Sequence, residues 1–490
     1  MATGTTGKLP ISEQAEQNKE QLNSKLGVGV TFDVAQHEFN IGQKKIFLYY
    51  INGFADNALV TQILRDLNNL QEQDMQSNVY EKLYHQYIPF FQLATVKLID
   101  EFIDKLLVGQ VGLIIDGESK AIIMDAKTYP GRQPEEPDTE RVVRGAHDGF
   151  TETLVINTAL TRRRIRDERL RFEVLQIGSR SKTDVAIAYL DQVANPRLIE
   201  TIKDKLKSVQ IDGVPMAEKT VEEFILGHSL NPFPLVRYTE RPDVAAIHLL
   251  EGHVLVYVDT SPSVMITPTT YFHHVQHAEE YRQRPVVGAY LRWVRFFGIL
   301  ASIFLLPLWL LLAQNPHYIP EALDFIGIKK MGKVPLVAQF LFAEVGLDLM
   351  RMAAIHTPTP LATAMGLIAA ILIGEVAINV GLFSPEVILY LAIAAIGTFA
   401  TPSYELSLAN RLVRIFLVIM VGLFSVPGFV VGIFLVLLTL ALTRSLDTPY
   451  LWPLIPFDGK ALKGILVRLA VPIGNSKRPA IVKSRNPYRE

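Results

Sequence analysis

The sequence predicts an α/β region built of two related halves, followed by an all-α region that crosses a membrane several times. Three observations support this fold class: charges are segregated along the chain, long uncharged stretches occupy the last third, and two local patterns are repeated. The chain has 490 residues, with 48 Lys and Arg against 49 Asp and Glu, and it contains no cysteine. This charge balance gives no overall attraction to nucleic acid. The missing thiols exclude disulfides, thiolate metal sites and cysteine nucleophiles.

Residues 1–31 are rich in Gly, Thr, Gln and Asn and contain few large apolar side chains. Little surface can be buried there to offset the entropy lost on ordering, so a disordered tail is expected. No basic segment followed by an apolar one occurs in this stretch, and a cleaved signal peptide is therefore not expected. The α/β region should then stay on the cytosolic side of a membrane.

Two sequence patterns in the α/β region occur twice. Residues 50–55 (YINGFA) resemble residues 189–194 (YLDQVA), 139 positions later, and residues 106–111 (LLVGQV) resemble residues 249–254 (LLEGHV), 143 positions later. Two patterns shifted by nearly the same amount indicate duplicated subdomains. Their expected boundaries are residues 32–129 and 130–285, and the succession of helices and hairpins predicts mixed sheets in both.

Each half is predicted to contain a strand, helices and a hairpin. In the first half the strand is expected at 45–51, the helices at 56–70 and 91–107, and the hairpin at 111–115 and 121–125. In the second half the strand is expected at 184–190, the helix at 195–207, and the hairpin at 254–258 and 264–267. The first strand of each hairpin leads to an aspartate, Asp116 or Asp259, and the dipeptide Asp116-Gly117 suits a tight turn.

Residues 286–443 are predicted to form the membrane region. From residue 296 to residue 443, 13 of 148 residues are charged, against 84 of the other 342. Stretches with no charge or a single acid cover residues 296–313, 361–383, 385–400 and 415–442. About 20 apolar residues cross a bilayer core, so about four spans are expected, together with one interfacial helix. Basic residues before the first span and in the tail 444–490 predict that both flanks are cytosolic, although Lys329, Lys330 and Lys333 oppose this orientation.

Glu375 is the first functional candidate in the membrane region. An acid within an apolar span is costly unless it faces water or a partner, and Asn379 lies one helical turn further on the same face. Both residues are candidates for the lining of a cation pathway that forms on oligomerisation. A structural hydrogen bond between helices is the alternative.

Two further patterns concern helix faces in the same region. Small residues recur at every fourth position and predict close helix packing, within the chain or between subunits, at Ala362, Gly366, Ala370 and Gly374. Charged residues share one face of a helix expected at 335–355, namely Glu344, Asp348 and Arg351. This face indicates either an interfacial helix lying along the bilayer or a segment that faces a pore in an oligomer.

The remaining clusters point to no enzymatic chemistry. Six arginines between residues 162 and 171 could bind phosphate, but the interleaved Asp167 and Glu168 favour ion pairs, so no nucleic-acid partner is expected. His273, His277 and Glu280 have helical spacing, yet no fourth ligand accompanies them and no metal is assigned. No nucleotide-binding or hydrolase motif is present. Neither an enzymatic activity nor a cofactor is therefore expected.

Short segments with a recognisable pattern are distributed over nearly the whole chain after the tail. They are residues 136–140 (EPDTE), 143–145 (VRG), 149–152 (GFTE) with Asn157, 162–166 (RRRIR), 211–213 (IDG), 239–243 (TERPD), 402–406 (PSYEL), and 444–445 (RS) with 449–451 (PYL). Together they resemble the A-subunit family of spore germinant receptors, the GerA family. The chain departs from the family at residues 146–148 (AHD), where a proline followed by Arg-Glu is more common.

This resemblance implies a multi-pass protein of the spore inner membrane that acts in germination. It also implies an ion-channel subunit that forms a homo-oligomer, a pentamer, through its membrane region and works with another spore inner-membrane protein. We therefore expect a subunit that promotes or amplifies ion release. The alternative is a non-conducting scaffold or regulator of another channel or germinant receptor. A secondary transporter is disfavoured because the membrane region has no inverted repeat.

Overall fold

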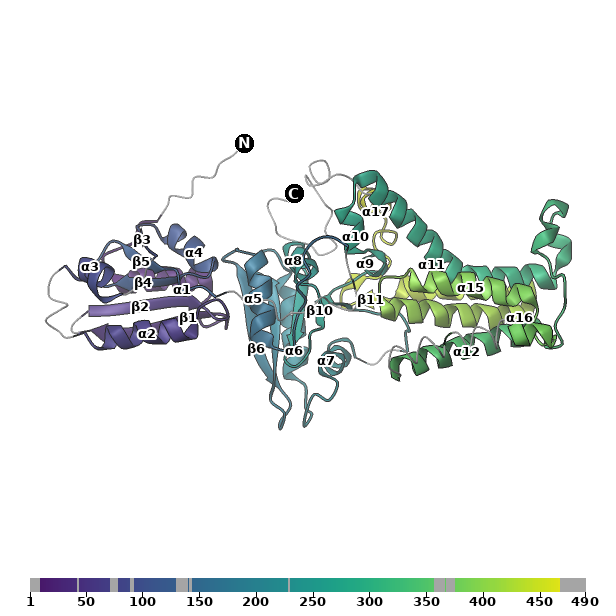
Figure 1. Ribbon diagram of the computed structural model, residues 1–490, viewed down its shortest axis with the longest axis horizontal. Helices are drawn as coiled ribbons and strands as arrows, with labels where there is room; N and C mark the ends of the chain where they lie inside the picture. Colours follow the sequence, from purple (N-terminus) through teal and green to yellow (C-terminus); the bar gives the residue numbers. More distant parts are fainter. Residues whose placement is uncertain are drawn as a thin grey trace. The chain divides into compact units, whose positions relative to one another are not determined.

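The computed structural model describes residues 9–41, 44–70, 78–88, 92–128, 140, 143–227, 230–356, 366 and 375–467. These residues form two compact units (Figure 1). The α/β unit contains residues up to 227 and residues 236–268, and the helical unit contains residues 230–235 and 269–467. The sequence predicts a boundary at 285/286, whereas the helical unit begins earlier because residues 271–275 pack against the apolar residues of its helices.

Two five-stranded sheets with the same strand order form the α/β unit. The orders are β1-β2-β4-β5-β3 and β6-β7-β9-β10-β8, and all neighbouring strands are antiparallel. The strands are β1 (Val34–Ile41), β2 (Lys44–Ile51), β3 (Leu93–Val96), β4 (Val111–Ile115), β5 (Ala121–Met124), β6 (Leu170–Ile177), β7 (Thr183–Leu190), β8 (Arg237–Thr239), β9 (Val254–Val258) and β10 (Val264–Thr267). The prediction of mixed sheets is wrong because the edge strands β1, β3, β6 and β8 join as antiparallel neighbours.

The helices of the two halves correspond as well. Those of the first half are α1 (Ala15–Leu26), α2 (Asn57–Asn68), α3 (Val79–Lys82), a π-helical turn (Leu83–Tyr87) and α4 (Ile99–Leu107). Those of the second half are α5 (Leu154–Arg164), α6 (Pro196–Lys207), α7 (Ala217–Leu226) and α8 (Pro242–Leu250). Helices α1 and α5 begin at residues 15 and 154, and helices α2 and α6 at residues 57 and 196, so both pairs repeat the offset of 139 seen in the sequence. The predicted duplication is confirmed.

The repeated aspartates perform the same task in both halves. Asp116 Oδ1 accepts a hydrogen bond from the backbone N–H of Ala15 at 3.1 Å, and Asp259 Oδ1 accepts one from the N–H of Leu154 at 3.1 Å. Each carboxylate satisfies an N–H group that the start of α1 or α5 would leave unpaired. The hairpin of each half therefore positions the first helix of that half.

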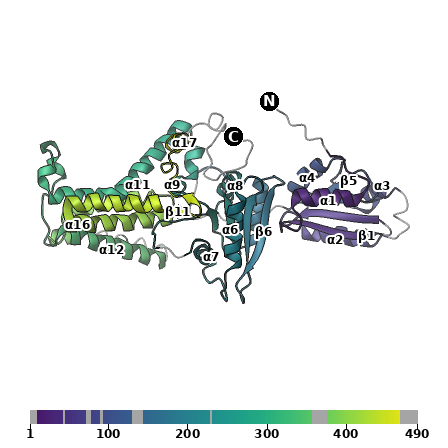
Figure 2. The same cartoon turned by 180° about the vertical axis from the view of Figure 1, so that it is seen from behind.

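Helices cover both faces of the first sheet because its central strands are apolar on both faces. In β2, Phe47 and Tyr49 pack against α1 and α4, whereas Ile46 and Leu48 pack against α2 and α3. Successive strand residues point to opposite faces, so an uninterrupted apolar run marks a strand that is buried on both sides. Figures 1 and 2 show α4 and α2 on opposite faces of this sheet.

Helix α1 corrects the prediction of a disordered tail over residues 1–31. Its Ala15, Leu22 and Leu26 side chains are buried in the core on one face of the first sheet. A few apolar residues at helical spacing are enough to dock this otherwise polar segment. The predicted helix at 91–107 is also wrong in its first part, because residues 93–96 form the edge strand β3.

Among its described residues, the helical unit contains four long or apolar helices, α11 (Pro285–Gln314), α12 (Leu336–His356), α15 (Pro385–Phe399) and α16 (Tyr404–Leu442). Its shorter elements are α9 (Tyr271–Val275), α10 (Ala278–Arg282), the 3-10 turns Pro316–Tyr318 and Glu321–Ile326, α14 (Ala377–Asn379), β11 (Arg444–Ser445), β12 (Thr448–Pro449) and α17 (Gly459–Leu466). Of the helices that the structure describes, α11 and α16 are long and apolar enough to cross a membrane, by length and composition. Helix α15 is apolar but shorter.

Helix α16 is a helical hairpin. Ser425 has φ 53° and ψ −130°, outside the helical range, and Pro427 follows. A Cβ atom at Gly432 would lie 2.8 Å from Leu417 Cδ2, although a straight helix would separate these residues by roughly 22 Å. The chain therefore reverses at Ser425, and the two antiparallel arms, residues 404–424 and 426–442, lie side by side (Figure 2). A single crossing at 415–442, as the sequence predicts, is not what the structure contains.

Candidate functional site

Several helices of the helical unit meet at the buried side chain of Glu344 in α12. Its carboxylate accepts hydrogen bonds from Nε of Arg411 at 3.0 Å and from Nε and Nη2 of Arg414 at 2.6 and 2.9 Å. Arg411 also donates to the backbone carbonyl of Glu344 at 2.7 Å and forms an ion pair with Asp348. The side chains of Glu344, Arg411 and Arg414 are 3%, 5% and 2% exposed. We call Glu344, Arg411 and Arg414, together with Asp348 at their edge, whose side chain is 41% exposed, the buried charge cluster.

Arg414 joins the first arm of α16 to two more helices. Its Nη1 donates to the backbone carbonyl of Ser302 in α11 at 2.7 Å and lies 3.2 Å from the hydroxyl oxygen of Thr398 in α15. Arg414 lies midway between Tyr404 and Phe424, the ends of this arm. A charge in such a place is tolerated only when it is well paired. The acceptors from α11, α12 and α15 supply this pairing.

Helix α12 buries the charged Glu344 and exposes apolar residues. Glu344 is 2% exposed, whereas Val345, Leu349 and Met352 are 55%, 62% and 58% exposed. Water as the surrounding medium would penalise the exposed apolar face, whereas lipid would not. The pairing with Arg411 and Arg414 offsets the cost of burying Glu344 in either medium.

The structure separates the three charged residues predicted for one face of α12. Glu344 lies inside the helical unit, where it pairs with Arg411 and Arg414, and its interfacial or pore-facing role stays a prediction. The side chain of Asp348 is 41% exposed, and the guanidinium of Arg351 lies 5.7 Å from the centre of the Phe399 ring. The pore-facing or interfacial role of Asp348 and Arg351 stays a prediction.

The predicted pore residues lie in a different segment. Glu375 is in a short π-helical stretch and Asn379 ends α14, and both residues are exposed. Of the small residues predicted to pack helices, Ala362, Ala370 and Gly374 lie outside the described residues. Gly366 has no described atom within 4 Å of the position that a Cβ would occupy. The roles of these residues in a pore and in helix packing remain predictions.

A close helix contact that was not predicted from the sequence joins α11 and α15. A Cβ atom at Gly397 would overlap the carbonyl oxygen of Gly298 and lie 3.2 Å from the Cβ of Ser302. Ser302 and Thr398, beside these glycines, are the residues whose oxygens contact Arg414. The close approach of α11 and α15 thus positions two acceptors of the buried charge cluster. Gly298 and Ser302 are four residues apart on one face of α11, and this spacing of small residues is the signal that could have indicated the contact.

In the α/β unit, the arginines of residues 162–171 form ion pairs. Arg162 is 1% exposed and donates from Nε and Nη2 to Asp33 at 2.8 and 3.1 Å, which joins α5 of the second half to the segment before β1 of the first. Arg164 pairs with Asp148, and Arg169 pairs with Asp167. The predicted preference for ion pairs over phosphate binding is confirmed for these three arginines.

Residues of the family motifs hold the loop that precedes α5. Arg241 is fully buried and donates to the backbone carbonyls of Glu140 and Ala146 at 3.3 and 3.1 Å. The side chain of Asn157 bonds both backbone polar groups of Thr151, at 2.7 and 2.5 Å. These motif residues therefore act on the fold of the α/β unit.

Comparisons with known proteins agree with this resemblance. Residues 20–481 match the family model described as Bacillus/Clostridium GerA spore germination protein. The chain is 53% identical to Stage V sporulation protein AF of Bacillus subtilis (strain 168), over 99% of this chain and 98% of the relative. It is 28% identical to Spore germination protein KA of the same organism, over 98% of this chain and 89% of the relative.

A solved structure is also similar to part of the chain. The crystal structure of the N-terminal domain of the A subunit of the Bacillus megaterium spore germinant receptor GerK3 matches with a TM-score of 0.43 and 25% identity, covering 54% of this chain and 98% of that chain. The family match and the identity over nearly the full length confirm the resemblance found in the sequence. The chain belongs to the GerA family of spore germination proteins.

Proposed function

We propose that this protein is an integral membrane protein of the spore inner membrane and a subunit of an oligomeric ion channel that promotes or amplifies ion release. Membership of the family supports a role in sporulation and germination. The observation that carries the finer proposal is the arrangement of α12, with paired charges inside the helical unit and apolar side chains outside. Ionisable residues inside a membrane protein commonly mark ion pathways or the elements that control them.

The α/β unit and the C-terminal tail are assigned to the cytosolic side. The segments that enter and leave the helical unit lie at the same end of it, since the backbone N–H of Tyr271 donates to the carbonyl of Tyr450 at 2.9 Å and Asn231 Nδ2 donates to Thr443 Oγ1 at 2.6 Å. A chain that enters and leaves at one end crosses an even number of times. We assign α11, α12, α15 and the two arms of α16 as crossings, and the sequence-predicted span at 361–383 makes the number even.

Glu375 and Asn379 are the proposed pore residues. Their exposure in a single chain leaves them available to water or to a neighbouring subunit. In a ring of subunits, a pentamer by analogy with the family, one carboxylate from each chain would form a cation-selective ring. The buried charge cluster would then hold the helices around this ring, because its charges are paired with one another.

Cation flux through proteoliposomes that contain the purified full chain tests this proposal. Glu375→Gln should lower the flux roughly tenfold, because the substitution removes the charge of the proposed ring. Glu101→Gln is the matched control, since it makes the same chemical change at an exposed residue of α4 in the α/β unit. Flux that is insensitive to Glu375→Gln would remove this residue from the pathway, and a chain that stays monomeric in mild detergent would contradict a pore between subunits.

A non-conducting scaffold or regulator of another spore membrane channel is the second candidate. The pairing within the buried charge cluster favours it, because the carboxylate of Glu344 is occupied by two arginines. Under this hypothesis the protein alone gives no flux in proteoliposomes. Flux would arise only when another spore membrane protein is added, and it would not change with Glu375→Gln.

A further inference from the structure

Helix α17 lies against the beginning of α11, which binds its C-terminal end, and its own N-cap residue closes the other end. Arg292 of α11 donates from Nη1 to the backbone carbonyls of Gly464 and Ile465, at 3.0 and 2.6 Å. These carbonyls belong to the last turn of α17 and lack partners within the helix. At the other end Asp458 accepts from the N–H groups of the first turn, with both distances at 3.0 Å. Helix α17 is therefore a fixed element of the helical unit.

Glu280 of α10 keeps Arg292 in place. Its Oε2 accepts from Arg292 Nε at 2.6 Å, and the same carboxylate pairs with Arg295. The side chains of Arg292 and Glu280 are 1% and 0% exposed. Removing either Glu280 or Arg292 would leave the other as an unpaired buried charge, so separation of these two side chains is costly. Since Arg292 also binds the end of α17, the three helices α10, α11 and α17 are held together, and we call them the corner of the helical unit.

The outer surface of this corner is both apolar and basic. Leu454, Ile455 and Phe457, in the loop directly before α17, are 42%, 49% and 74% exposed. Lys460 and Lys463 of α17 are exposed as well, and within the described part of the chain they form no ion pair. We call these five residues the α17 surface. The sequence beyond it, residues 468–490, carries six basic residues and one acidic residue, so this end of the chain is strongly positive.

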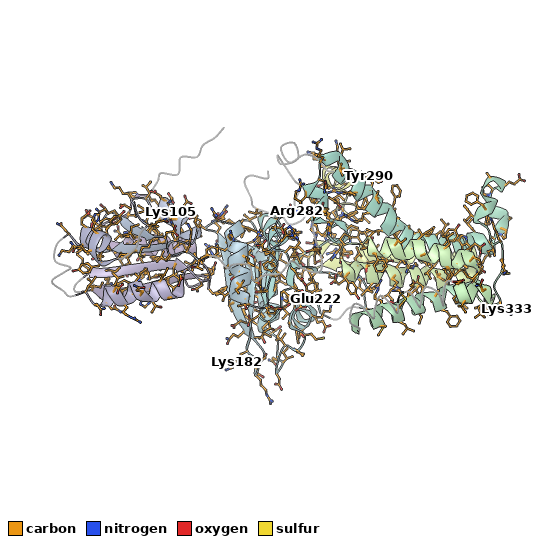
Figure 3. The ribbon with its side chains drawn as sticks, viewed as in Figure 1. Lys105, Lys182, Glu222, Arg282, Tyr290 and Lys333 are labelled. Carbon is orange, nitrogen blue, oxygen red and sulfur yellow. The ribbon has the colours of Figure 1, made fainter. Side chains whose placement is uncertain are left out.

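The first turns of α11 place this surface at the level of a membrane interface. Tyr290, Trp293 and Phe297 are 66%, 43% and 64% exposed, and aromatic residues of this kind gather where lipid headgroups meet the hydrocarbon. Figure 3 labels Tyr290 at this end of the helical unit and Lys333 at the opposite end. The α17 surface thus borders the region where α11 would enter the hydrocarbon.

We propose that the α17 surface binds the headgroups of anionic phospholipids in the cytosolic leaflet. Lys460 and Lys463 contact the phosphates, and Phe457 reaches into the boundary of the acyl chains. The positive charge of the α17 surface favours an anionic lipid as its ligand. Unpaired lysines next to exposed apolar side chains are complementary to a membrane leaflet that is anionic at its surface and apolar below it. The inference rests on the proposed membrane location and does not depend on ion conduction.

Quenching of tryptophan fluorescence by brominated lipids tests this proposal. Trp293→Phe and Trp309→Phe leave Trp452, beside the α17 surface, as the remaining tryptophan of the full chain, which is reconstituted in a mixture of phosphatidylglycerol and phosphatidylcholine with one or the other lipid brominated. Each lysine near an anionic surface contributes about fivefold to lipid affinity. We therefore expect an at least tenfold preference for phosphatidylglycerol beside Trp452, seen as stronger quenching when this lipid is the brominated one, and nearly equal quenching after Lys460→Gln with Lys463→Gln.

Lys329→Gln with Lys330→Gln is the matched control, since these two exposed lysines lie in the loop near Lys333. This pair should leave the preference at Trp452 unchanged, and far-ultraviolet circular dichroism checks that all variants fold. Equal quenching by both lipids in the parent chain, or an undiminished preference after the Lys460 and Lys463 substitutions, would overturn the proposal. Quenching by neither lipid would overturn the proposed membrane location itself. A lipid preference without cation flux would contradict only the proposed ion-channel function.

Discussion

Replacing Glu344 by Gln is expected to destabilise the helical unit by about 3–5 kcal/mol, the usual effect of removing one member of a buried ion pair. The carboxylate accepts three hydrogen bonds, one from Arg411 and two from Arg414. Gln keeps one acceptor oxygen but turns an amide donor toward the guanidinium groups. It also removes the negative charge that compensates both arginines.

The magnitude follows from the charges that remain. Two unit charges about 4 Å apart attract each other by about 4 kcal/mol at an effective dielectric constant of about 20. Arg411 keeps a second acidic partner in Asp348, whereas Arg414 keeps the neutral oxygens of Ser302 and Thr398. Most of the loss in the free energy of unfolding should therefore come from Arg414.

A double substitution, Glu344→Met with Arg414→Met, separates charge imbalance from loss of contacts. It removes one charge of each sign and leaves the ion pair between Arg411 and Asp348. We expect the double variant to be more stable than Glu344→Gln by at least about 1.5 kcal/mol, because no unpaired charge remains inside the helices. The control Glu321→Gln, at an exposed residue, should stay within about 0.5 kcal/mol of the unmodified protein.

The free energy of unfolding of the full chain is measured by denaturant titration in mild detergent, followed by circular dichroism. A Glu344→Gln protein as stable as the unmodified chain would refute the reasoning. So would a double variant less stable than the single one, since that would show that contacts, and not charge balance, decide the stability of this site.

Gly397→Ala should lower the free energy of unfolding by about 1–3 kcal/mol in the same titration, because the new methyl group overlaps the carbonyl of Gly298. Gly298→Ala, whose Cβ would meet that of Ala400 at 3.4 Å, should cost less, and the reverse order would contradict the close approach of α11 and α15. In the α/β unit, burial lowers the pKa of His248 from 6.5 to about 3, so the folded chain stays neutral at this residue while the unfolded chain takes up a proton. Stability is then complete above pH 6.5 and should fall by about 1.4 kcal/mol per pH unit below it. His248→Leu should lack this component, and identical pH slopes in both proteins would count against it.

The apolar pattern of the sequence predicts the central strands well and the edge strands poorly. Strand β2 is apolar on both faces, and its predicted start differs from the observed one by one residue. The edge strand β1 has three consecutive polar residues at its centre and is partly exposed, so its signal is weak. Helix α1 is hidden in the same way, because most of its residues are polar and only Leu22 and Leu26 are large buried side chains.

The candidate site could be predicted only in part. The helical spacing of the sequence places Glu344 and Asp348 on one face of a helix, but it predicts an interfacial or pore-facing position and no ion pair. Arg411 and Arg414 lie just before the uncharged stretch at 415–442, and this position predicts that they flank a membrane span. Both arginines bind Glu344 although they lie 67 and 70 residues after it in the sequence. No local sequence pattern predicts such a long-range contact. Likewise, Pro427 predicts a break in the helix, but it does not predict that the chain reverses its direction at Ser425.

In the membrane location that we propose, the order of the charged residues along the chain matters during insertion. Glu344 is synthesised before Arg411 and Arg414, so an α12 inserted as proposed would already offer a counter-ion when the arginines reach the bilayer. The tight turn at Ser425 joins the two arms of α16 directly, so both arms would enter the lipid together as a helical hairpin. A rearranged chain that placed residues 404–442 ahead of α12 would expose two uncompensated cations to the bilayer during its biogenesis.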